Sequence, residues 1–179
     1  MKRTCAWAIR STNIADPGCF TMRPLLAALG TLLSALPMPS DAQARTFSRA
    51  DPYDARIIAA HRCNSAAVNG GYTEPLIAEC KAVYDATILF ERSAQASTPA
   101  QRTALAIAKS LPMMTIAAGY AVQDGVMSAR TCQAIRMMSQ PLADYDPAAA
   151  NGLEPFYQLL VQTRDQGIPK CRQGGHWPG

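Results

Sequence analysis

The chain of 179 residues has 17 basic and 13 acidic side chains, a formal net charge of +4. This length indicates one domain that is large enough for a buried core. The basic residues are scattered singly, and so small an excess does not favour a nucleic-acid partner.

The first long apolar run lies in residues 22–44, MRPLLAALGTLLSALPMPSDAQA, and has the three parts of a secretory signal peptide. A short basic start precedes the uncharged segment 25–36, and Ala42-Gln43-Ala44 is a small-x-small cleavage site. The apolar segment is shorter than the roughly 20 residues that a membrane span requires. We therefore predict a periplasmic or secreted protein that is cleaved after Ala44, and the style of the signal favours a bacterial source.

Residues 1–21 are more polar and precede this signal. We interpret them as an upstream start-site artefact, with Met22 as the true start; the alternative keeps them as a long basic leader. Either interpretation leaves residues 45–179 as the mature domain. Because the first 44 residues hold four basic and two acidic side chains, the mature domain has 13 basic and 11 acidic residues, a net charge of +2.

The mature sequence predicts helices separated by turns, because the alternation typical of strands is nearly missing. The first helix begins at Asp51-Pro52, a capping residue followed by a proline that suits the first turn. It ends at residues 69–72, NGGY, where Asn and Gly can adopt the left-handed conformation of a helix end. The second helix opens at Thr73 and fades near residue 95.

A third helix is predicted for about 99–123, and residues 98–101, TPAQ, give it a capping-box start. It contains the apolar run 104–122, in which Lys109 is the single charge. We expect a central helix buried on all sides rather than a stable membrane span, because a lysine in mid-span costs about 2.5–3.5 kcal/mol. Pro112 removes one backbone hydrogen bond, which predicts a kink or a break nearby.

A fourth helix is predicted for about 126–139, with Pro141 as its stop. Proline disfavours helical conformation in the residue before it, so the chain should leave the helix there. Residues 144–152, DYDPAAANG, then form a loop, with one helical turn at Pro147.

A fifth helix begins near Leu153 and is predicted to end at Gly167 and Pro169. The Gly-rich tail from about residue 172 is expected to be mobile. The predicted fold class is therefore all-α: a single domain of about five helices packed around the 99–123 helix and fixed by two disulfides.

Four cysteines remain after signal cleavage, and an even number in an oxidising compartment favours two disulfides. Cys63 and Cys80 lie level across the antiparallel hairpin of the first two helices, at about 1.5 Å per residue, so we pair them. Cys132 and Cys171 then pair by elimination, although the sequence leaves other pairings open. A zinc site is disfavoured because no CxxC pair occurs.

Candidates for catalysis are few. His61 lacks an accompanying GxSxG, HExxH or SxxK pattern, and a structural histidine explains it better. The acidic pairs Asp51/Asp54 and Asp144/Asp146 lie at helix starts or in loops, where capping explains them better. We therefore predict no catalytic residue and a protein that is not an enzyme; a small periplasmic hydrolase that uses His61 or an acidic pair is the alternative.

Five methionines remain in the mature domain, at positions 113, 114, 127, 137 and 138. Thioethers bind Cu(I), and an exported protein can carry it. Adjacent methionines point in different directions on a helix, however, and methionine commonly fills cores. We predict no copper site, no other metal and no cofactor.

No motif identifies a family, and exported helical proteins with disulfides include inhibitors, immunity proteins and stress chaperones. We predict a non-catalytic binding protein, such as an inhibitor or immunity protein, whose partner is another protein or an envelope component. A structural envelope protein held by the apolar segment 104–122 is a further alternative. Tyr72 and Trp177 belong to residue types that anchor interfaces, but hairpin packing and a mobile tail explain them better, so the binding residues stay unknown.

We expect Arg45 to be the N-terminal residue of the exported protein, because the small-x-small site ends at Ala44. N-terminal sequencing or the intact mass of the secreted form measures this. Retention of residues 22–44 in that form would contradict the signal-peptide prediction.

Overall fold

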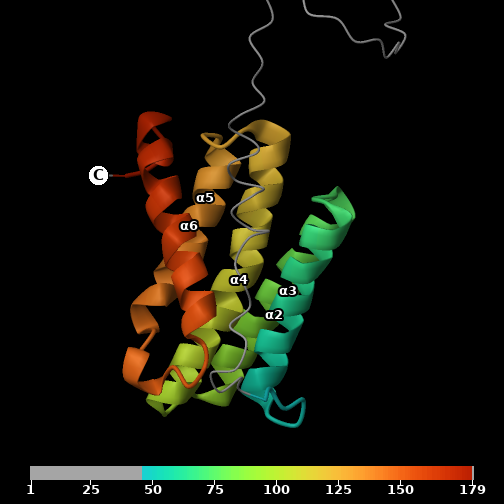
Figure 1. The fold of residues 1–179 in the computed structure, drawn as a ribbon, viewed down its shortest axis with the longest axis vertical. Helices are drawn as coiled ribbons and strands as arrows, with labels where there is room; N and C mark the ends of the chain where they lie inside the picture. The colour runs from blue at the N-terminus through green and yellow to red at the C-terminus, as the bar shows by residue number, and fades with distance from the viewer. Residues whose placement is uncertain (1–45, 179) are drawn as a thin grey trace, which may run out of the picture. The chain divides into compact units, whose positions relative to one another are not determined.

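The computed structural model describes residues 46–178, which form a bundle of α-helices (Figure 1). The helices are α2 (Pro52–Gly70), α3 (Glu74–Ala94), α4 (Pro99–Asp124), α5 (Ala129–Ser139) and α6 (Glu154–Gln173), with the short 3-10 helices η1 (Gln140–Asp144) and η2 (Pro147–Ala149). Residues 46–178 contain no strand, so the all-α prediction is confirmed. The predicted start-site artefact, residues 1–21, and signal peptide, residues 22–44, lie outside the described residues and stay predictions.

The first three helices begin where the capping residues predict. The Asp51 carboxylate accepts hydrogen bonds from two backbone amides of the first turn of α2, at 2.8 and 2.9 Å. Thr98 and Gln101 form the complete capping box at the start of α4, because each side chain accepts a hydrogen bond from the backbone amide of the other residue. Local chemistry therefore sets these boundaries.

Helix α4 is the centre of the bundle. It packs against α2, α3, α5 and α6, and every residue from 103 to 117 is buried. Among residues 46–178, α4 is the one helix that is long and apolar enough to cross a membrane by length and composition. Because 78% of that apolar window is buried inside the bundle, the packing is that of a core helix.

Pro112 does not break α4, since the chain is helical without interruption on both sides of it, and the alternative of a kink stays a prediction. An interior proline costs about 3 kcal/mol in a helix, so tertiary contacts must offset that cost. Ser110 donates a buried hydrogen bond to the Met138 carbonyl at 2.8 Å, and the Thr115 hydroxyl donates to the Asn64 side chain at 3.2 Å. These contacts anchor α4 to α5 and α2 on either side of the proline.

The boundaries of α5 and of the chain after it differ slightly from the prediction. Helix α5 begins at Ala129 rather than near 126, because the Ser128 hydroxyl caps it by accepting a hydrogen bond from the Thr131 amide at 3.2 Å. Pro141 ends the α-helix, yet the chain continues as η1 before the predicted loop. The helical turn predicted at Pro147 is present as η2.

The predicted end of the last helix is wrong, because α6 continues through Gly167 and Pro169 to Gln173. Gly167 packs so closely on α5 that an added Cβ would lie 2.6 Å from Ile135 Cδ1. Cys171 is bonded to α5 beyond the proline, so tertiary contacts hold the last turns in the helix. The tail turns back on this end, and the His176 amide donates to the Cys171 carbonyl at 2.9 Å. Mobility of the tail stays a prediction.

The two disulfides have the predicted pairing. Cys63 is bonded to Cys80 and Cys132 to Cys171, each with a Cα–Cα distance of 5.5 Å. The sequence separations of 17 and 39 residues correspond to about 3 and about 4 kcal/mol of stabilisation in the chain-entropy view. The bonds join α2 to α3 and α5 to α6, so two covalently fixed helix pairs pack on α4.

The single charge of the apolar segment has a partner. Lys109 Nζ lies 2.6 Å from Glu91 Oε1, and the two side chains are 9% and 35% exposed. An ammonium group this deep in a core is tolerated only when it is paired. The pair therefore fixes α3 against α4 at a defined register.

We expect the variant Glu91→Ala to lower the free energy of unfolding by about 1–3 kcal/mol, because it leaves the Lys109 ammonium buried without its carboxylate. Lys109→Met should cost less or increase stability, since an apolar side chain suits this position. Urea unfolding followed by circular dichroism measures both changes. The exposed pair on α3 gives the control: Asp85→Ala should change stability by less than about 0.5 kcal/mol. Equal losses from the two core variants would contradict this account.

Candidate binding groove

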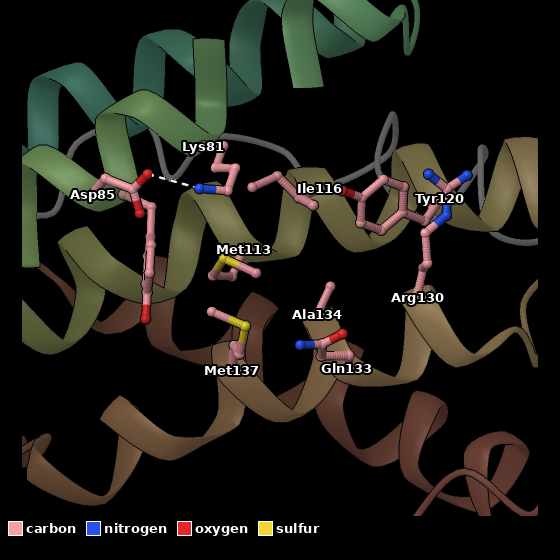
Figure 2. Close-up of a pocket in the computed structure, with 10 residues that line it drawn as sticks. Lys81, Asp85, Met113, Ile116, Tyr120, Arg130, Gln133, Ala134 and Met137 are labelled. Atoms are coloured by element: carbon pink, nitrogen blue, oxygen red, sulfur yellow. Dashed lines mark hydrogen bonds and ion pairs between the residues drawn. The ribbon is translucent and has the colours of Figure 1, made fainter. Parts of the chain in front are cut away.

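A groove runs over α4 between α3 and α5. These two helices each pack on α4 but scarcely touch one another, and a cavity of about 300 Å³ opens between them (Figure 2). Residues from all three helices line it: Lys81, Tyr84 and Asp85 from α3, Met113, Ile116 and Tyr120 from α4, and Arg130, Gln133, Ala134 and Met137 from α5. The groove is therefore a side of the central helix that the two fixed helix pairs leave partly uncovered.

The floor of the groove is apolar. Met113, Ile116 and Tyr120 follow each other at intervals of three and four residues, which places them on one face of α4. Ala134 and Met137 extend this surface onto α5. Met113 and Ile116 have little exposure, so a ligand in the groove would meet a surface that is already shaped by the core.

Charged side chains stand at the rims, and each is paired. On α3, Lys81 Nζ lies 2.8 Å from Asp85 Oδ2. Arg130 forms two hydrogen bonds with Asp124, at 2.6 and 2.8 Å, and its guanidinium group lies over the Tyr120 ring at 4.5 Å. Bidentate pairing and ring stacking hold an arginine in one geometry.

The pKa shifts at the groove follow from these contacts. The hydrogen bond from Arg130 lowers the pKa of Asp124. The hydrogen bond to Asp85 raises the pKa of Lys81, and burial raises the pKa of Tyr84. All three shifts stabilise the form that already dominates at neutral pH, so the groove holds fixed charges and a protonated phenol.

His61 lies outside the groove, on the α2 side of the molecule. Its half-buried ring meets Phe156 of α6 edge to face, with ring centroids 5.7 Å apart. Asp51 caps α2, and the buried Asp54 accepts a hydrogen bond from the Ser48 amide at 3.0 Å. His61 therefore has a packing contact with an aromatic ring, and Asp51 and Asp54 have hydrogen bonds at the start of α2.

The remaining candidates also lie away from the groove lining. Asp146 caps η2 by accepting a hydrogen bond from the Ala148 amide at 2.9 Å, and Asp144 is exposed. Tyr72 is half-buried and lies beside α4. A Cβ added at Gly119 would lie 3.7 Å from the Tyr72 Cβ. Trp177 is half-buried in the tail. Within residues 46–178, no group of three or more His, Cys, Asp or Glu residues is arranged to hold a metal ion.

Sequence reasoning missed the groove. The spacing in the sequence places Met113, Ile116 and Tyr120 on one face of a helix. The segment around them is apolar on all faces, however, so this face does not stand out. Only the positions of α3 and α5 show which face stays open. Comparisons with protein-family models, curated protein sequences and solved structures find no match to this chain.

We expect the carboxyl group of Asp124 to titrate below its ordinary pKa of 3.8, because Arg130 donates two hydrogen bonds to the ionised form. A lowered folded-state pKa means that the pair stabilises the fold above the unfolded-state pKa, and that this contribution disappears as the pH falls through the folded-state pKa. Carboxyl ¹³C NMR during an acid titration measures the value. Arg130→Gln should return the pKa of Asp124 toward 3.8, whereas Arg136→Gln, an exposed change on the same helix, should not. An unchanged Asp124 titration in Arg130→Gln would refute the assignment.

Proposed function

We propose that this protein is a small exported binding protein that holds a macromolecular partner, another protein or an envelope component, without chemical turnover, as an inhibitor or immunity protein does. The groove between α3 and α5 is the observation that carries the proposal. It combines an apolar floor with a rim of charged and polar side chains, which is the composition of a protein interface with a buried centre.

The chemistry of the groove suits binding better than catalysis. A nucleophile needs a base within hydrogen-bond reach that is itself oriented by a third group. The rim charges are instead engaged with one another, Lys81 with Asp85 and Arg130 with Asp124. Thioether and aliphatic groups on the floor contribute dispersion and burial of apolar surface, which are the terms that stabilise a complex.

The scaffold also favours binding. Both rims belong to helix pairs that are closed by disulfides, α3 through Cys63–Cys80 and α5 through Cys132–Cys171. A binding surface that is already ordered loses less conformational entropy when the complex forms. Rigid rims therefore raise the affinity that a small groove can reach.

The two alternative functions have less support. A hydrolase built on His61 would need a polar partner in line with the imidazole, whereas the packing contact of this ring is with Phe156. A structural envelope protein held by α4 would need the apolar face of that helix turned outward, and most of the face lies inside the bundle. Neither alternative uses the groove.

The test is capture of a partner by the exported protein carrying a C-terminal tag. Met137→Glu places a charge on the apolar surface of the groove and should reduce capture from envelope extract by at least about tenfold, the result of a loss of about 1.4 kcal/mol or more. Met127→Glu is the matched control, because Met127 is 43% exposed and lies outside the groove lining. Circular dichroism and the thermal midpoint check that both variants fold.

His61→Ala gives the second arm and should leave capture unchanged. Capture that is equally strong in Met137→Glu and Met127→Glu would exclude the groove as the binding site. Loss of a hydrolytic activity in His61→Ala, at an unchanged thermal midpoint, would replace the binding proposal with the hydrolase.

A further inference from the structure

We infer that the groove accepts one aromatic side chain of the partner protein, held against the thioethers of Met113 and Met137. This inference rests on the binding function proposed above and names the chemistry that the groove would recognise. It follows from the side chains that line the cavity, from its size and from the way its rim charges are paired.

The two thioethers give the first reason. Met113 projects from α4 and Met137 from α5, and Figure 2 shows both side chains at the cavity, with Tyr120 and Arg130 toward its other end. Sulfur is polarisable and makes favourable contacts with aromatic rings, and methionine adapts its shape to a flat ligand. Tyr84 and Tyr120 add ring surfaces that can pair with a further ring in offset or edge-to-face geometry.

The size of the cavity gives the second reason. A volume of about 300 Å³ is at the lower end of the range of about 300–1,000 Å³ for ligand pockets, and it suits one ring-bearing side chain. The cavity is open along its rim, where Lys81, Asp85 and Gln133 are exposed. A free aromatic molecule would leave one side in water there, whereas the backbone of a partner protein would cover that side. We therefore assign the ring to a protein.

The rim charges give the third reason. Lys81 and Arg130 both have a carboxylate partner, at 2.8 and 2.6 Å, so the rim has balanced charge on each side. Such a rim selects neither an acidic nor a basic ligand, so it favours an uncharged group of the ligand. Gln133 supplies an amide that can both donate and accept, which suits the indole N–H of tryptophan or the hydroxyl of tyrosine. An aromatic residue of this kind is a common anchor of protein interfaces.

The experiment uses the exported protein with ¹³C-labelled methionine methyl groups and two probes, N-acetyl-tryptophanamide and N-acetyl-leucinamide. Tryptophanamide should shift the methyl signals of Met113 and Met137 in a saturable way, because an indole ring placed against them produces a ring-current shift. Met127, which is exposed outside the groove, and Met138, which is fully buried, are internal controls and should move far less. Leucinamide should produce no comparable shift.

Two substitutions test whether the thioether of Met137 contributes to binding of the tryptophan probe. Met137→Leu keeps an apolar side chain but removes the thioether, and should weaken binding of the tryptophan probe by about threefold. The control Met127→Leu should leave it unchanged. In the capture assay, raising the salt concentration should have little effect, because the contact is not ionic.

The outcomes separate this inference from the function on which it rests. Capture that depends on Met137 together with a ring-current shift at Met113 and Met137 supports both. Capture that depends on Met137, with no saturable shift from the tryptophan probe, overturns the aromatic ligand and leaves the binding function in place. A saturable shift without groove-dependent capture overturns the protein source, and the groove would then be a site for a free aromatic molecule.

Discussion

Burial of α4 on nearly every side is the constraint from which the other features follow. A helix whose residues are buried from 103 to 117 needs neighbours all around it, and small side chains let those neighbours approach. At Gly119 the approach is so close that an added Cβ would lie 2.6 Å from Ile77 of α3. The one charge in the buried segment, Lys109, is compensated by Glu91 from the same neighbour. The packing of α3 on α4 is thus fixed by shape at one point and by charge at another.

Four helices in two disulfide-closed pairs surround α4, and this arrangement leaves two seams where one pair meets the other. Aromatic side chains meet at the seam between α2 and α6: His61 packs on Phe156, which also meets Phe47 with ring centroids 6.3 Å apart. The seam between α3 and α5 is the groove, which residues of α3, α4 and α5 line. Aromatic rings therefore meet across one seam, whereas the other seam holds a cavity.

Much of the fold could be predicted from local chemistry. Asp51, Thr73 and Thr98 each cap a helix by a hydrogen bond within a few residues, so the sequence near each start carries the information. The pairing of Cys63 with Cys80 followed from the rise per residue along two antiparallel helices, a geometric constant. Where a boundary depends on neighbouring residues in the chain, reading the sequence is sufficient.

The failures have a common physical cause, which is that tertiary contacts can outweigh local preference. Pro112 and Pro169 are both poor residues for a helix interior, yet each lies between contacts that hold the helix on both sides of it. The groove is a stronger example, since Met113 and Ile116 are no different in the sequence from the buried residues around them. Their distinction is that α3 and α5 scarcely touch one another beside them, and that separation belongs to the arrangement of helices rather than to any segment.

The division of apolar surface in this small domain also fits the binding function proposed above. Within residues 46–178, the buried apolar side chains gather around α4, and an exposed apolar face elsewhere would favour aggregation. In the groove, the apolar floor lies below the rims, where Lys81 pairs with Asp85 and Arg130 with Asp124. These paired charges keep the entrance hydrated without attracting ions of either sign. Under the binding function proposed above, a partner would reach the apolar floor only by inserting a side chain between the rims, so shape complementarity would limit what binds.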